Sequence, residues 1–102
     1  MNEDKTQNVI SELLNRKLIE EVKKENSGGD FFKLTKRFYR HLRKNIKHNP
    51  PKDMDSINEE YYTEVISLTI IDTGLITENA LIDAIIVIKL LMEKAKAKPT
   101  FK

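Results

Sequence analysis

The chain of 102 residues contains no cysteine and no tryptophan, and only three glycines and three prolines. The absence of cysteine excludes a disulfide scaffold, a thiolate metal site and a cysteine nucleophile, and it fits an intracellular protein. Long apolar runs are also absent, because the most apolar window, residues 80–92, already includes Asp83 and Lys89. A membrane-spanning helix needs about 20 apolar residues, so we expect none here.

The N-terminal residues 1–5 are polar and acidic, and they lack the basic and then apolar stretch of a signal peptide. We therefore expect a cytoplasmic protein. A chain of this length can bury an ordinary hydrophobic core, and it has no room for a second one. We expect a single domain over residues 1–102.

Motifs that carry catalysis are missing as well. The sequence has no His-Glu-x-x-His, P-loop or dinucleotide fingerprint. The adjacent carboxylates at 20–21 and 59–60 point apart in a strand or a helix, so neither makes a pair around a substrate. On a helix, His41 and His48 would lie about 10.5 Å apart along the axis, too far to share a metal ion. We expect no enzyme, no cofactor and no metal site.

A net charge of +2 conceals two strongly opposed blocks. Residues 31–52 contain eight lysines and arginines and no acid, whereas residues 53–93 contain nine acids and one lysine. The blocks therefore carry +8 and −8. Either they compensate each other within the fold, or they leave a basic and an acidic face for different partners.

The clearest helix covers residues 36–48, with Thr35 as its cap and a proline pair at 50–51 after its end. On a helical wheel its apolar residues fill a narrow stripe of about 100°. These are Phe38, Tyr39, Leu42 and Ile46. Nearly opposite lies a continuous basic face made of Lys36, Arg37, Arg40, Arg43, Lys44 and Lys47. Such a face can neutralise nucleic-acid phosphates, so we expect these six side chains to bind a phosphate backbone.

Two further helices are expected at residues 55–73, with Asp55 or Ser56 as the N-cap, and at residues 77–97. The last helix is apolar nearly all round, which indicates burial in the core or against a second copy of the chain. We therefore expect a homodimer. The interface residues we expect are Ile82, Ile85, Ile86 and Leu90.

The first third of the chain leaves two alternatives open. As one helix over residues 5–25, its apolar stripe would jump from one face to the other near Lys17. A helix over residues 5–17 followed by a β-hairpin over residues 18–34, with Gly28-Gly29 in its turn, describes the pattern better. The fold class is then mainly α, with about four helices and a short hairpin. The alternative is an all-α four-helix bundle with a kink near Lys17.

The hairpin and the helix before it carry a family resemblance. Leu-Leu-Asn-Arg-Lys at 13–17 is followed by Leu-Ile-Glu-Glu-Val at 18–22, a Gly-rich turn, and Phe-Phe-Lys-Leu-Thr-Lys at 31–36. This order resembles the recognition helix and wing of winged-helix transcription regulators of the PadR or MarR type, over residues 6–38. The chain departs from that family in having Lys17 and Phe38 at usual glycine positions. It also has five residues where two preceding helices are usual.

The resemblance implies that residues 6–17 form a helix placed in the major groove of DNA. Its groove or backbone contacts would be Asn8, Ser11, Asn15 and Arg16. The wing contacts would be Lys23, Lys24, Asn26 and Ser27. The expected function is thus a small DNA-binding protein, involved in transcription regulation or otherwise DNA-associated. The alternative is a protein-protein interaction module, such as an adaptor, an inhibitor or an immunity-type helical protein, that uses the opposed charged faces.

Overall fold

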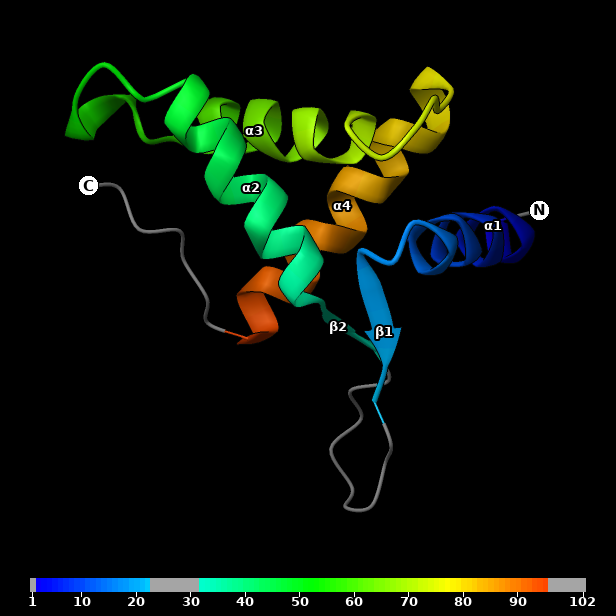
Figure 1. Ribbon diagram of the computed structural model, residues 1–102. Helices are drawn as coiled ribbons and strands as arrows, with labels where there is room; N and C mark the ends of the chain where they lie inside the picture. Colours follow the sequence, from blue (N-terminus) through cyan, green and yellow to red (C-terminus); the bar gives the residue numbers. More distant parts are fainter. Residues whose placement is uncertain (1, 23–31, 96–102) are drawn as a thin grey trace.

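Four helices and one two-stranded hairpin make up the fold, and the structure, a computed structural model, describes residues 2–22 and 32–95 (Figure 1). The element order is α1 (Asn2–Asn15), β1 (Ile19–Glu21), β2 (Phe32–Leu34), α2 (Lys36–His48), a 3₁₀ turn η1 (Met54–Ser56), α3 (Glu59–Ile71) and α4 (Glu78–Ala95). The expected mainly α fold with a short hairpin is confirmed, and the continuous helix through residue 25 is wrong.

Helix α1 ends in a motif that normally contains glycine. The amide of Leu18 donates to the carbonyl of Leu13 at 3.0 Å, and the amide of Lys17 donates to that of Leu14 at 2.9 Å. This is the Schellman pairing, which places its C′ residue in the left-handed region. Lys17 accordingly has a φ of 61°. The sharp stop redirects the chain from α1 into β1.

The hairpin pairs β1 and β2 antiparallel, with Ile19 opposite Leu34 and Glu20 opposite Lys33. Ile19 and Leu34 are buried, whereas Glu20 and Lys33 point to solvent with their charged groups 3.6 Å apart. This alternation of buried and exposed positions is what a sheet with one face on the core requires. The base of the hairpin therefore belongs to the core.

Helix α2 begins and ends where the sequence predicts. The Thr35 hydroxyl accepts a hydrogen bond from the Phe38 amide at 3.1 Å, and it donates to the Lys17 carbonyl at 2.8 Å. One threonine thus caps α2 and ties its first turn to the end of α1. The expected apolar stripe is confirmed, since Phe38, Leu42 and Ile46 are buried.

Helix α3 starts later than expected, and its cap differs from the expected one. Asp53 caps the 3₁₀ turn η1, where its side chain accepts from the Ser56 amide. Asn58 caps α3, where its side chain accepts from the Tyr61 amide at 3.0 Å. Asp55 and Ser56 were plausible caps because they precede Glu59 and Glu60, but the short turn occupies both of them.

Helix α4 supplies much of the core and packs against α1, α3 and β2 (Figure 1). Its buried side chains are Ala84, Ile85, Ile88 and Met92. They join one apolar cluster with residues of every other helix and of both strands. Within residues 2–22 and 32–95, no helix is long and apolar enough to cross a bilayer.

Candidate nucleic-acid interface

The six basic residues expected on α2 are all exposed in the structure. Four of them, Lys36, Arg40, Arg43 and Lys47, follow one another at steps of four, three and four residues. On an α-helix these steps produce one straight line of charges about 16 Å long. We call these four residues the basic stripe.

No side chain of the basic stripe is paired with an acid in the part of the chain that the structure describes. They make no side-chain hydrogen bond there either. The acidic block therefore does not compensate these four charges, which remain available for an external partner.

The remaining two cations of α2 are engaged with the fold. The Lys44 ammonium lies 3.8 Å from a carboxylate oxygen of Asp72, at the end of α3. The Arg37 guanidinium donates through Nε to the carbonyl of Arg16 at 3.1 Å, so it links the start of α2 to the end of α1. Both side chains can still reach solvent, but each already has a structural contact.

Asp72 is the centre of a polar cluster between α2 and α3. The buried Asn45 amide lies 3.0 Å from the Asp72 carboxylate and 3.2 Å from the Thr69 hydroxyl. The His41 Nδ1 atom lies 3.8 Å from the same carboxylate, is itself buried, and has no hydrogen-bond partner among the described residues. This cluster fixes the rotation of α2 and so keeps the basic stripe turned outward. The sequence analysis missed it, because Asn45 is a polar residue beside the apolar stripe.

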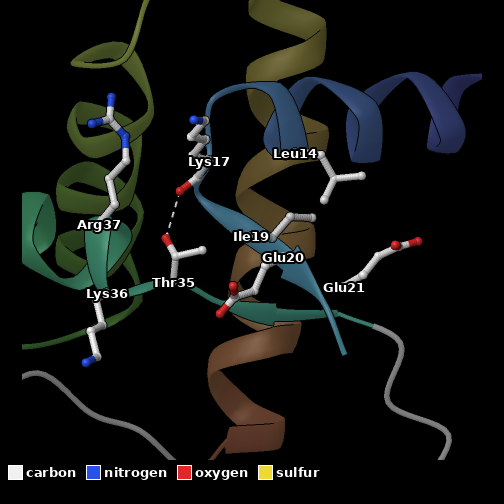
Figure 2. A pocket seen from close by; sticks show the side chains of 8 residues that line it. All are labelled: Leu14, Lys17, Ile19, Glu20, Glu21, Thr35, Lys36 and Arg37. Atoms are coloured by element: carbon white, nitrogen blue, oxygen red, sulfur yellow. Dashed lines mark hydrogen bonds between the residues drawn. The ribbon is translucent and has the colours of Figure 1, made fainter. Parts of the chain in front are cut away.

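An open depression of about 730 Å³ lies beside the start of α2, between that helix and the hairpin (Figure 2). Its lining residues are Leu14, Lys17, Ile19, Glu20, Glu21, Thr35, Lys36 and Arg37. Figure 2 shows the Lys36 and Arg37 side chains pointing in opposite directions from the first turn of α2. The cations thus do not converge on one small molecule. Lys36 and Arg37 instead extend the basic surface around the first turn of α2.

The structure corrects the expected role of Arg16, whose side chain is only 7% exposed. Its guanidinium donates to the carbonyls of Ile70, Gly74 and Leu75, to the Thr73 hydroxyl and to the Glu12 carboxylate. A buried side chain with all three of its guanidinium nitrogens engaged within the fold is not placed to hold a phosphate. Arg16 instead joins α1 to the turn between α3 and α4.

The other residues implied by the winged-helix resemblance fall into two groups. Asn8, Ser11 and Asn15 are exposed and lie along one side of α1, at steps of three and four residues. The wing residues Lys23, Lys24, Asn26 and Ser27 lie outside the described residues.

Aromatic side chains next to the basic stripe are not free to stack on bases. Phe38 is fully buried, and Tyr39 packs edge-on against it with ring centroids 5.3 Å apart. Burial raises the pKa of the Tyr39 phenol. The surface of α2 therefore offers charge rather than a stacking platform.

Of the four residues expected at a dimer interface, one lies in the core and three lie at the surface. Ile85 is buried, so its inclusion in the interface was wrong; it faces the core, where it contacts the other helices. Ile82, Ile86 and Leu90 are each about half exposed. Which side of an all-round apolar helix stays uncovered depends on its neighbours, and hydropathy alone does not show it.

Metal-ligating side chains do not form a site among the described residues. In these ranges, no group of three or more histidine, aspartate and glutamate side chains is placed to hold a metal ion. Comparisons with known proteins found no match to any family model, curated protein or solved structure. The geometry of the chain itself is therefore the basis for a functional proposal.

Proposed function

We propose that this chain is a small, non-enzymatic, cytoplasmic DNA-binding protein that holds the phosphate backbone with α2. The observation that carries the proposal is the basic stripe, four exposed cations in one line with no acidic partner among the described residues. The N-terminus of α2 adds to it, since the first turn contains no acid and a helix N-terminus favours anions. In its more specific form, the proposal is a role in transcription regulation, in which α1 and the hairpin contact DNA as the recognition helix and wing of a winged-helix protein.

Salt dependence tests the proposal directly. Four phosphates neutralised by the basic stripe give a slope of about −3.6 for the logarithm of the binding constant against that of the salt concentration. The affinity for a random duplex then falls about 150-fold between 50 and 200 mM salt, as measured by fluorescence anisotropy.

A pair of double variants locates the contact. Arg40→Gln with Arg43→Gln removes two phosphate contacts, so the loss of affinity over the same salt range falls to about 12-fold. Lys52→Gln with Lys94→Gln changes the net charge equally at two exposed lysines outside α2, and it keeps the steep dependence. Absence of binding at 50 mM salt, or equal slopes for the two double variants, contradicts the proposal.

A second candidate is a protein-interaction module, and the acidic side of the molecule favours it. Glu60 and Glu64 are exposed on α3 and have no ion-pair partner in the described part of the chain. A basic protein could dock there, or an acidic one on the basic stripe. This function predicts no affinity for duplex DNA at 150 mM salt and one specific protein in a pull-down.

A homodimer belongs with either function. A dimer would present two basic stripes to one duplex. Once the first stripe is bound, the second binds intramolecularly, which raises the affinity without any new kind of contact.

A further inference from the structure

Exposed apolar side chains are concentrated on one helix. Among the described residues, the large apolar side chains that are exposed are Met54, Ile71, Leu75, Ile82, Ile86 and Leu90. The last three recur at every fourth residue of α4, with exposed fractions of 51%, 52% and 55%. We call these three the apolar ridge.

The apolar ridge lies opposite the face of α4 that fills the core. At 100° per residue, its three side chains and the exposed Asn79 and Glu93 at its two ends fall within a sector of about 80°. The buried Ala84 and Ile88 lie on the far side of the helix. The elements that α4 packs against among the described residues, α1, α3 and β2, leave the ridge about half exposed to solvent.

We infer that a second copy of this chain covers the apolar ridge, with the two α4 helices antiparallel and the twofold axis at Ile86. A ridge of residues spaced by four fits into the groove beside an equal ridge on another helix. The twofold operation then places Ile82 of one copy next to Leu90 of the other, and Ile86 next to its own counterpart. An isologous interface needs such self-complementarity.

The charges of α4 determine the direction of the pair. The N-terminal half of the helix contains two acids, Glu78 and Asp83, and no base. The C-terminal half contains two lysines, Lys89 and Lys94, and one acid, Glu93, but the Lys89 ammonium is already paired with the Glu59 carboxylate of α3 at 3.0 Å. An antiparallel pair therefore sets the half with charge −2 against a half whose remaining charges cancel, whereas a parallel pair sets the two halves with charge −2 together.

The size of the ridge determines the strength of the dimer. Three half-exposed side chains per copy bury much less than the roughly 800 Å² per partner of a standard stable interface. We therefore expect a weak, reversible dimer that forms at tens to hundreds of micromolar protein. The inference depends on α4 alone, so it can fail while the basic stripe still binds DNA, and the reverse also holds.

Sedimentation of the whole chain tests the dimer. From tens to hundreds of micromolar protein, the weight-average mass rises from that of one chain, 11.9 kDa, toward twice that value. Ile86→Glu places two carboxylates together at the twofold axis, so this variant stays at the mass of one chain. Leu75→Glu adds the same charge at a residue that is 96% exposed and lies off the ridge, and it leaves the dimer intact.

Cysteine cross-linking tests the direction, and it is unambiguous because the chain has no cysteine of its own. In an antiparallel pair, a mixture of Ile82→Cys and Leu90→Cys chains forms a mixed disulfide under mild oxidation. Ile82→Cys alone does not, since its two sulfurs stand about 12 Å apart along the helix, beyond disulfide reach.

Two results overturn the inference. If the wild-type chain stays at the mass of one chain over the whole concentration range, the ridge serves a different protein. If Ile82→Cys alone cross-links as readily as the mixture, the helices are parallel.

Discussion

Lys17 stands at a position where the backbone favours glycine. Its φ of 61° is the left-handed conformation that the end of α1 requires, and Lys17 is the only residue other than glycine with a positive φ in the described ranges. A β-carbon in this region costs free energy that glycine avoids. The resemblance to winged-helix regulators pointed to the same position, since those proteins usually have glycine there.

Replacing this lysine by glycine should stabilise the protein. We expect Lys17→Gly to raise the free energy of unfolding by about 0.5–1 kcal/mol, because relief of the left-handed strain exceeds the added freedom of the unfolded chain. Urea denaturation at pH 7 measures the change. Lys17→Ala is the matched control, since it removes the same side chain but keeps the strain, and its midpoint should stay near that of the wild type. If the two variants behave alike, strain at position 17 is not the cause.

Arg16 shows what sequence reasoning at the residue scale cannot supply. An arginine beside Asn15 at the end of a helix is a reasonable phosphate ligand, and nothing in the neighbouring residues indicates otherwise. Its acceptors, the carbonyls of Ile70, Gly74 and Leu75, lie more than fifty positions along the chain. Only the packing of α1 beside the α3–α4 turn brings them together.

At the scale of elements, periodicity and capping predicted most of the fold. The bounds of α2 agree to the residue, because its amphipathic stripe, its threonine cap and its proline stop all point to the same ends. The β-branched run at residues 85–88 lies within α4, inside the helix expected over residues 77–97. The predicted start of α3 was wrong because Asp55, Ser56 and Asn58 can each cap a helix. The local sequence does not show which of the three does so.

The junction of α2 and α3 depends on Tyr61. Its hydroxyl donates to the Asn49 carbonyl at 2.7 Å, which joins the first turn of α3 to the residue after α2. Burial raises the pKa of this phenol, and the nearby Glu64 carboxylate and Tyr62 raise it further. The phenol therefore holds its proton more tightly in the folded chain than in the unfolded one.

This raised pKa predicts a loss of stability in alkali. Below about pH 10 the Tyr61 phenol is protonated in both the folded and the unfolded chain, so its contribution to the free energy of unfolding is complete. Above about pH 10 the phenol of the unfolded chain loses its proton first, and the free energy of unfolding falls. We expect Tyr61→Phe to lose about 1 kcal/mol at pH 7, through the missing hydrogen bond, and to lose less than the wild type between pH 9 and about 11. Urea midpoints across this range give both quantities. Equal alkaline losses in the two proteins would refute the assignment.

At the scale of the whole molecule, the sequence showed two opposed charge blocks but not how they meet. That depends on which faces of α2 and α3 pack together, and the contact is made by buried residues such as Asn45 and Thr69. Among the described residues, Asp72 is the one acid that lies within ion-pair distance of a lysine or arginine of α2, and that cation is Lys44. The same limit applied to α4, where hydropathy predicted burial all round and packing left one ridge uncovered.

The basic stripe and the apolar ridge are on different helices, and their coupling is a property of the whole molecule. If two copies pair through α4 and each holds phosphates with α2, a duplex long enough for both should be bound by the pair as one unit. We expect the wild-type chain to prefer a duplex of about four helical turns over one of about one turn, by at least tenfold more than Ile86→Glu does. The number of overlapping sites on the long duplex is the same for both proteins, so it cancels in this comparison.

Leu75→Glu carries the same added charge and should keep the wild-type preference. Equal preferences in the wild type and in Ile86→Glu would mean that each copy meets DNA alone, even where the dimer itself is established by sedimentation.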